Sequence, residues 1–408
     1  MVYSYIGGNM EENKKQKSFS TSETIILVLM ASIVSYFIGH ILITGKSSTV
    51  ISSRDPYIEE FAKNYKYILE NYYEKLDKQD LINSAINGML ESLDDPYSVY
   101  MDESSSDNFN ITLNGSYQGI GVQIVKDETT GYVLVTGVFK DSPASKAGLK
   151  AGDYIISANN IKTKDTDISD FSKYIRESTD TEFNMHILRD KKEMDIKLVR
   201  TNVVLASVTS EVFEKNNKKV GYIYIGIFAS NTDIQFKEEL NKLKKEGITS
   251  LIIDVRDNTG GHLTSVDNIL DIFIDSSHIK YQFYQNGVTT KINGINKNVE
   301  KYNIVLLGNE NSASASEVLI AGIKENLGAK FIGKKTYGKG TVQELINLTD
   351  GNQYKITIKK WLTPNGNWVN DTKGIVPDIE VDLNEAYLKT QDDKDDNQLQ
   401  KAIEYLTK

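Results

Sequence analysis

The stretch IVLLGNENSASASEVLIAGIKENLG, residues 304–328, contains a predicted strand, a turn and a helix in succession. The apolar run 304–308 is typical of a buried strand. Beyond the turn, apolar residues recur at a spacing of four, which predicts a helix, and Gly328 follows as a typical C-cap. The residues at that spacing are Leu319, Ile323 and Leu327. A strand that leads into a helix is the repeating element of an α/β domain.

The preceding region has the same order of elements. Apolar runs at 220–227 and 250–255 predict buried strands, and an amphipathic pattern over about 234–245 predicts a helix between them. Such a β-α-β unit pairs its strands in parallel. The second strand leads into RDNTGGHL, residues 256–263, where the glycine pair Gly260-Gly261 is either a helix-entry turn or a loop whose N–H groups bind a ligand.

Three serines alternate with alanines in the turn of residues 309–317. Ser312, Ser314 and Ser316 precede the predicted helix, where unpaired N–H groups and the helix dipole favour negative charge. This environment suits an attacking hydroxyl and a developing oxyanion. Ordinary capping of the helix by one of the serines is the structural alternative.

A catalytic serine needs a general base, and histidines are scarce in this chain. The four are His40, His186, His262 and His278, of which only His262, beside the glycine pair, is a candidate. A lysine kept neutral by burial is the other option. Lys339 fits because its neighbouring glycines, in YGKGTVQ at 337–343, let the backbone pack closely around the amine. Gln343 lies four residues on, where its carbonyl can orient that amine.

The segment before Lys339 also has to be weighed as a phosphate-binding loop. GKKTYGK at 333–339 resembles the start of that motif, yet Gly340 stands where Ser or Thr is required, and Thr341 comes one position late. The residues that follow, 341–347, have the pattern of a strand, whereas the motif continues as a helix. The sequence therefore argues against a nucleotide site.

From about residue 113 to residue 202 the chain has short strand-like runs separated by turns. The segments GIGV (119–122), DSPA (141–144), AGL (147–149) and AGDYII (151–156) together resemble a PDZ domain. Glycines around an apolar residue leave N–H groups free for a peptide carboxylate, and the next strand offers an edge for an extended peptide. The resemblance implies a peptide-binding loop formed by Gly119, Ile120, Gly121 and Val122. Phe171, Tyr174 and Ile175 are expected on a helix beside that groove.

The N-terminal region predicts a membrane anchor. Residues 24–45 lack Asp, Glu, Lys and Arg, and about 20 apolar residues span a bilayer as a helix. Three lysines precede this run, so residues 1–23 are expected in the cytoplasm and the rest of the chain outside the cell membrane, as a single-pass protein. A cleaved signal peptide is the alternative, but the run is long for one and no clear cleavage site follows.

Composition excludes several kinds of site. The 408 residues carry a net charge of -9 with a pI near 5.2, which argues against nucleic acid as a partner. The absence of cysteine excludes disulfides, thiolate catalysis and Cys-type zinc sites. With so few histidines, no metal site is expected.

The ordered motifs from about residue 83 onward resemble those of the carboxy-terminal processing proteases, also called tail-specific proteases. They are AINGMLESLDDPYSVY (85–100), the PDZ segments, the loop 256–261, SASASE (312–317), YGKGTVQ (337–343), TPNG (363–366), GIVPD (374–378) and QLQKAI (398–403). The resemblance implies an α/β (α+β) multidomain chain. Its parts are a tether and helical region (46–112), a PDZ β-barrel-like domain (113–202), an α/β serine protease core of the ClpP/crotonase type (203–384) and a helical tail (385–408).

The resemblance also assigns roles to individual residues. These are Ser314 as nucleophile, Lys339 as general base, Gln343 as its support, and the amides of Ala315 and of the glycine pair, with Gly260 favoured, as oxyanion donors. The chain departs from the family at Thr259, where proline is usual, and at His262, where an aliphatic residue is usual. Both positions lie in a loop that needs only backbone amides, and the role of His262 stays open.

The implied activity is that of a membrane-anchored serine endopeptidase without a cofactor. Protein substrates with accessible C-terminal tails would be captured by the PDZ groove, and filling the groove would align the site. Arg189 is a candidate charge partner in that switch, or a surface arginine. A catalytically weak PDZ scaffold is the alternative function. The apolar faces of the terminal helix (Leu399, Ala402, Ile403, Leu406) and of the helices before Asp95 would either pack on their own core or pair two copies as a homodimer.

Overall fold

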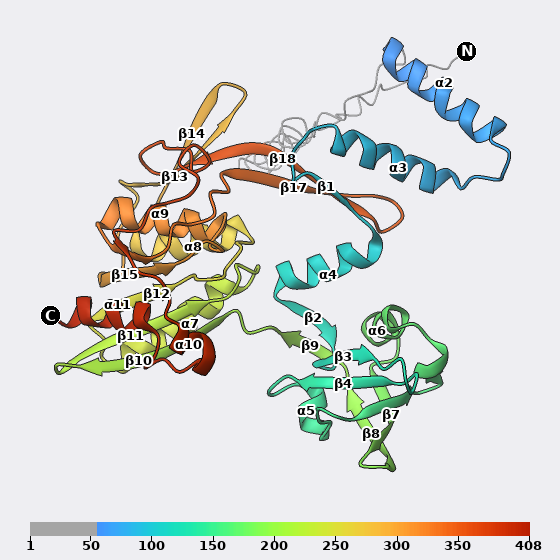
Figure 1. Cartoon of the computed structure of the whole chain (residues 1–408), viewed down its shortest axis with the longest axis horizontal. Helices are drawn as coiled ribbons and strands as arrows, with labels where there is room; N and C mark the ends of the chain where they lie inside the picture. Colours follow the sequence, from blue (N-terminus) through green and yellow to red (C-terminus); the bar gives the residue numbers. More distant parts are fainter. Residues whose placement is uncertain (1–54) are drawn as a thin grey trace, which may run out of the picture. The chain divides into compact units, whose positions relative to one another are not determined.

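A computed structural model of the chain describes residues 55–408 (Figure 1). The chain divides into two compact units, residues 1–81 and 82–408. The predicted cytoplasmic segment 1–23, the anchor 24–45 and the start of the tether lie outside the described residues and stay predictions. Within residues 55–408, no helix is long and apolar enough to cross a membrane.

The first unit contains α2 (Pro56–Asn71) and the start of α3 (Lys78–Glu91). Asp55 caps α2, since its carboxylate accepts a hydrogen bond from the N–H of Tyr57 at 2.9 Å. No residue of α2 is buried among the described residues. Helix α3 ends before Asp95-Pro96, as the proline predicts.

The predicted PDZ domain is a separate β-structure. Its ends are joined by β2 (Ser116–Gly119) and β9 (Thr201–Val204), which pair antiparallel. Its main sheet has the order β3-β4-β5-β7-β8, with β6 beside β5. The elements are β3 (Val122–Lys126), β4 (Val133–Val138), α5 (Pro143–Ala147), β5 (Tyr154–Ala158), β6 (Ile161–Lys162), α6 (Ile168–Glu177), β7 (Glu182–Arg189) and β8 (Lys192–Val199). Phe171 and Ile175 of α6 are buried in its core and Tyr174 packs against it, which confirms the predicted face.

The C-terminal half is an α/β domain around a six-stranded sheet. The strand order is β10-β11-β12-β15-β16-β19, antiparallel between β10 and β11 and parallel elsewhere. The strands are β10 (Val208–Lys215), β11 (Lys218–Ile225), β12 (Ser250–Asp254), β15 (Asn303–Gly308), β16 (Lys330–Gly333) and β19 (Ile379–Glu380). The predicted β-α-β unit is therefore confirmed as β11, α7 (Thr232–Lys245) and β12.

Helices cover both faces of this sheet. Helices α7, α8 (Leu263–Phe273) and α9 (Ala315–Leu327) pack on one face, and α11 (Asn397–Thr407) packs on the other (Figure 1). The apolar residues of α11, Leu399, Ala402, Ile403 and Leu406, are buried within their own chain. Of the two roles considered for this helix, packing on its own core is therefore the one observed.

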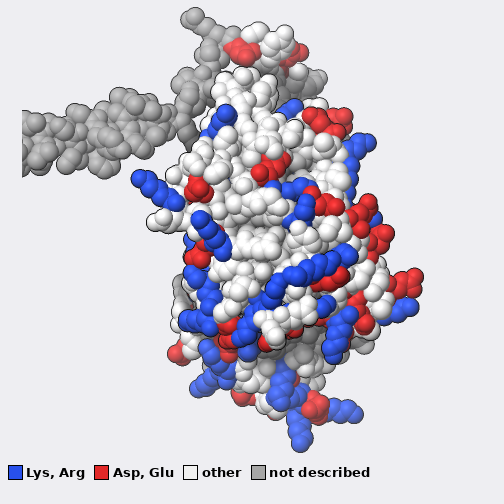
Figure 2. Space-filling model, turned by 90° about the vertical axis from the view of Figure 1, so that its left-hand side faces the viewer, with Lys and Arg blue, Asp and Glu red and all other residues white. Residues whose placement is uncertain are grey.

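The domain has a second sheet, of five strands. Its order is β1-β18-β13-β14, with β17 also paired to β18. The strands are β1 (Val99–Met101), β13 (Ile279–Gln285), β14 (Val288–Asn293), β17 (Thr341–Asn347) and β18 (Gln353–Leu362). Helix α4 (Glu103–Asn114) follows β1, and α10 (Glu385–Thr390) precedes the terminal helix. On the face shown in Figure 2, basic and acidic side chains are interspersed.

Candidate active site

The site forms where two neighbouring parallel strands end. Because Asp254 of β12 pairs with Leu307 of β15, the loops after these strands start side by side. Buried serines join them: Ser312 Oγ donates to Val255 O at 2.8 Å, and Ser316 Oγ donates to Asn258 O at 2.7 Å.

Ser314 differs from its two neighbouring serines because it lines a cavity of about 610 Å³. It caps α9 with φ 55° and ψ -114°, outside the helical region. The alternation of serine and alanine could not show which of the three serines faces a cavity. The loop geometry makes that distinction.

Close packing requires both glycines of the pair, Gly260 against the turn of Ser314 and Gly261 against the backbone at Phe228. A Cβ on Gly260 would lie 2.9 Å from Ser314 Cβ, and one on Gly261 would lie 2.2 Å from Phe228 O. Both glycines also have positive φ, 107° and 137°. Only glycine therefore fits at either position.

The backbone amides around Ser314 differ in what they bind. The N–H of Gly260 donates to Asn258 Oδ1 at 2.9 Å, in a turn formed by the asparagine side chain. The N–H groups of Gly261 and Ala315 have no acceptor among the described residues. The N–H of Gly260, which was favoured as an oxyanion donor, is therefore engaged. The N–H groups of Gly261 and Ala315 are available to bind an oxyanion.

Glu317 holds the segments of Ser314 and Lys339 together. Its Oε2 accepts from the N–H of Ser314 at 2.9 Å and of Lys339 at 2.8 Å. Its Oε1 accepts from the N–H of Gly338 at 2.7 Å and from Thr336 Oγ1 at 2.6 Å. The side chain is fully buried, and burial raises the pKa of this carboxyl while the four hydrogen bonds oppose that shift. Among residues 55–408 its four hydrogen-bond partners are all donors, which fits an ionised carboxylate, because this group only accepts.

Lys339 lines the same cavity as Ser314. Burial, together with the charge of Lys355, lowers the pKa of Lys339 to about 8, against smaller opposing effects of Asp95 and Glu317. Its Nζ lies 4.5 Å from the centroid of the Tyr97 ring. No hydrogen bond joins Lys339 Nζ to Ser314 Oγ in the described structure.

Gln343 also lines the cavity, from β17. Its Nε2 donates to the hydroxyls of Thr341 at 2.9 Å and Thr357 at 3.1 Å, so the amide oxygen is the group left to accept from an amine. A shift of register between Val342 and Gln343 sets this orientation. The sequence spacing could not reveal that bulge.

The cavity has further walls to which the sequence analysis gave no role. Phe109, Thr112 and Leu113 come from α4, and Lys355 comes from β18. His262 lines the cavity as well, and burial lowers its pKa. Among residues 55–408, no group of three or more His, Asp or Glu side chains is placed to hold a metal ion.

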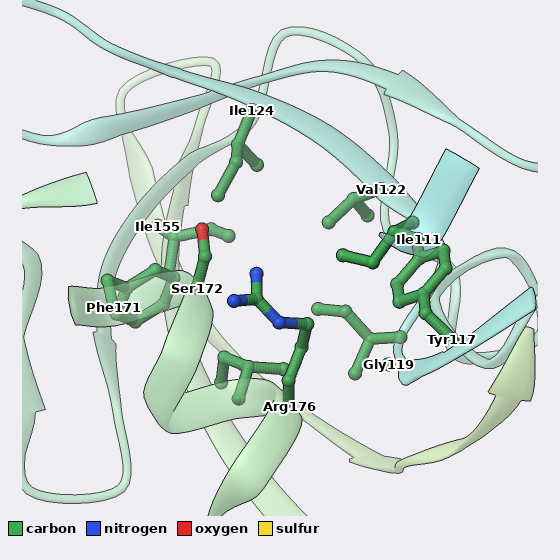
Figure 3. A pocket seen from close by; sticks show the side chains of 12 residues that line it. Ile111, Tyr117, Gly119, Val122, Ile124, Ile155, Phe171, Ser172 and Arg176 are labelled. Atoms are coloured by element: carbon green, nitrogen blue, oxygen red, sulfur yellow. The ribbon is translucent and has the colours of Figure 1, made fainter. Parts of the chain in front are cut away.

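The PDZ domain has its own groove, with a cavity of about 170 Å³ (Figure 3). The predicted loop Gly119–Val122 forms one wall, and Phe171 and Ile175 of α6 form another. Arg176 also lines this groove and donates to Asp107 of α4 at 3.1 Å. Arg189, the candidate charge partner in the switch, pairs with Asp153 of the PDZ domain at 2.6 Å, and its role in the switch stays a prediction.

Comparison with known proteins agrees with this architecture. Peptidase family S41 matches residues 219–381, a PDZ domain matches 134–189, and the activating protease CtpB N-terminal domain matches 43–105. Carboxy-terminal processing protease CtpB of Bacillus subtilis is 37% identical over 333 residues, 81% of this chain and 69% of that protein. CtpA of the same organism is 33% identical over 88% of this chain and 76% of that protein.

Among solved structures, the photosystem II D1 C-terminal processing protease is 25% identical, with a TM-score of 0.46, over 79% of this chain and 86% of that one. The family is established by the sequence relatives. The chain belongs to peptidase family S41 and is a serine-type carboxy-terminal processing protease with a PDZ domain.

Proposed function

We propose that Ser314, Lys339 and Gln343 form the catalytic triad, with an oxyanion hole made by amides of Ala315 and of the glycine pair. The observation that supports this most strongly is that Ser314 shares its cavity with a lysine whose pKa is lowered to about 8. Near that pH, half of the lysine side chains are neutral amines that can accept a proton.

The proposed reaction is acyl transfer. Neutral Lys339 takes the proton of Ser314 Oγ as this oxygen bonds to the scissile carbonyl carbon, and backbone N–H groups stabilise the oxyanion. The C–N bond then breaks, and the lysine ammonium gives its proton to the leaving amine. Water hydrolyses the resulting ester, which restores the serine and releases a new C-terminal carboxylate.

Substrate capture belongs to the same proposal. A C-terminal tail would add to the edge of β3 with its carboxylate at the Gly119–Val122 loop. Helix α4 links the two sites, since Ile111 lines the PDZ groove while Phe109, Thr112 and Leu113 line the catalytic cavity. A bound tail would then act on the catalytic cavity through α4.

A second candidate is a catalytically weak PDZ scaffold, and two features of residues 55–408 are compatible with it. Ser314 and Lys339 are not hydrogen-bonded, and the N–H of Gly260 is engaged by Asn258. A resting enzyme, aligned only when the groove is filled, would have the same features.

The full chain is tested against an unfolded protein such as reduced casein, beside Ser314→Ala, Lys339→Ala and His262→Ala. The triad predicts cleavage that is lost in the first two variants and kept in the third. Equal cleavage by all four proteins would refute the triad. Cleavage lost with His262→Ala and kept with Lys339→Ala would make histidine the base.

We also propose that residues 24–45 anchor the protein in the cell membrane with its catalytic part outside, because this run is apolar and follows three lysines. The test is protease treatment of intact cells followed by alkaline extraction of membranes. An anchored, outward-facing protein is digested in intact cells and stays in the membrane pellet. Protection from the protease, or release by alkali, would contradict the proposal.

A further inference from the structure

A second lysine in the catalytic cavity has no role in the triad. Lys355 lies near the start of β18, is half-buried and lines the cavity together with Lys339. Its Nζ lies 5.2 Å from the centroid of the Phe109 ring on α4. Within residues 55–408, it forms no ion pair with any carboxylate.

Two carboxylates act electrostatically on this lysine pair, those of Asp95 and Glu317, and both accept hydrogen bonds from other groups. Asp95 accepts from Ser98 Oγ at 2.6 Å and from the N–H of Tyr97 at 3.1 Å. Glu317 accepts four hydrogen bonds of its own, as described above. Among residues 55–408, neither carboxylate forms an ion pair with Lys355, and both have other partners.

The charged form of Lys355 is energetically unfavourable in the cavity when no substrate is bound. Burial disfavours its charged form and lowers the pKa of Lys355, with Asp95 opposing from a distance. The charges of Lys355 and Lys339 also repel each other. A cation kept under these conditions, in a reaction cavity, is typical of a functional group.

We propose that Lys355 binds a carboxylate of the substrate inside the catalytic cavity, and so favours cleavage next to an acidic group. This inference rests on the proposed protease function. The carboxylate has two sources, an Asp or Glu side chain near the scissile bond or the terminal carboxylate of a tail cut close to its end. A single ammonium group with three donors suits either source.

The test begins by mapping the bonds cut in reduced casein. Peptides spanning one such bond are then made in pairs, with Glu or Gln at each of three positions on either side, and with a free or an amidated C-terminus. They are hydrolysed by the full chain, Lys355→Met, Lys355→Arg and Lys359→Met. Lys359 is a matched control, because it lies on the same strand with its Nζ also 5.2 Å from a phenylalanine ring, that of Phe283.

In one of these pairs we expect the peptide with the extra carboxylate to have a kcat/KM about tenfold higher than its neutral counterpart. That peptide carries either Glu at one position or a free C-terminus. The preference should fall to about one in Lys355→Met. The ratio of kcat/KM within each pair is the readout, because loss of the Lys355 charge also raises the pKa of Lys339 and changes the rate on both members of a pair. The preference should persist in Lys355→Arg and Lys359→Met. Loss of the Glu preference identifies a side chain as the source, and loss of the free-terminus preference identifies the tail.

Other outcomes would overturn the proposal. The proposal is wrong if the wild-type protein cleaves both members of every pair equally, that is, Glu and Gln peptides alike and free and amidated peptides alike. This result does not depend on the variants. A preference that persists in Lys355→Met also contradicts the proposal. If the preference that persists is for free C-termini, the PDZ groove is its source. If the wild type cleaves all peptides equally and Ser314→Ala is inactive, only the Lys355 site is refuted. If the wild type cleaves no peptide, the proposed protease function is refuted as well.

Discussion

At the scale of single residues, the environment of Lys339 makes activity depend on pH. Its pKa is lowered to about 8, and only the neutral amine can accept the proton of Ser314. We expect kcat/KM on a neutral peptide to rise with pH with a midpoint near 8, and Lys339→Met to lose about a thousandfold or more. A profile measured from pH 6 to 10 checks this. A midpoint near 6.5 that disappears in His262→Ala would contradict it.

The same lysine affects stability in a predictable direction. Because its pKa is lower in the folded protein than the ordinary 10.5, the unfolded chain binds more protons between about pH 8 and 10.5. The buried ammonium therefore costs stability below pH 8, and the cost disappears as the pH rises to 10.5. We expect Lys339→Met to raise the Tm at pH 7 and to leave it nearly unchanged above pH 10.5. A lower Tm at pH 7 would argue that the amine stabilises the fold.

The neighbouring glycines indicated Lys339 as a candidate base, whereas only the family resemblance distinguished Ser314 from Ser312 and Ser316. The structure places Ser314 and Lys339 in one cavity. The sequence could not identify what surrounds the amine. Asp95 and Tyr97 precede Lys339 by more than 200 residues, and only folding brings them near it. Asp95-Pro96 predicts a helix end and belongs to the motif 85–100, but neither observation indicates that Asp95 lies near the site.

At the scale of elements, Glu317 fixes the turn before α9 to the segment before β17. Glu317→Gln keeps the shape but replaces one accepting oxygen by a donor, which then faces N–H groups. We expect a lower Tm and at least a tenfold loss of kcat. The midpoint of the pH profile should also move below 8, because Glu317 raises the pKa of Lys339.

The pH midpoint separates electrostatic from structural effects of this substitution. Thr336→Val is the matched control, since it removes one of the four hydrogen bonds to Glu317 and leaves the charge in place. It should lower the Tm with little change in midpoint. A Glu317→Gln profile with an unchanged midpoint would show that Glu317 acts only as a structural support.

The glycine loop gives an independent prediction about elements. In Gly261→Ala the new methyl group would meet Phe228 O at 2.2 Å, so the loop must shift and activity should fall about a hundredfold or more. Gly247→Ala is the control, because Gly247 also has positive φ, 77°, but nothing lies within 4 Å of an added Cβ. That variant should lose only about 1–2 kcal/mol of stability and keep its kcat. If Gly261→Ala and Gly247→Ala have the same kcat, the glycine loop does not contribute to catalysis.

Elements were predictable where periodicity extends over many residues, as in the β11–α7–β12 unit and in α9 with its Gly328 cap. Two details that orient the site were not. The bulge at Val342-Gln343 depends on pairing with β18, and the turn that engages the N–H of Gly260 depends on the side chain of Asn258. Neither leaves a pattern in the sequence, because each is decided by one contact.

At the scale of the whole molecule, α4 connects two cavities that the sequence treated separately. Its Ile111 lines the PDZ groove, and three of its other residues line the catalytic cavity. Two ion pairs tie α4 to α6 of the PDZ domain, Arg176 with Asp107 at 3.1 Å and Lys173 with Glu103 at 2.5 Å. If the groove beside Arg176 binds a tail, as proposed, we expect the bound tail to bias the position of α4.

This arrangement predicts activation by a peptide that is not itself cleaved. A short peptide with a free C-terminal carboxylate should raise the rate on a neutral reporter peptide, and its amidated form should not. In Asp107→Asn the activation should weaken by up to about fivefold, as expected for a partly exposed ion pair. Arg189→Gln is the control, because its ion pair with Asp153 stays inside the PDZ domain. Activation that is unchanged in Asp107→Asn, or lost equally in Arg189→Gln, would mean that α4 does not carry the coupling.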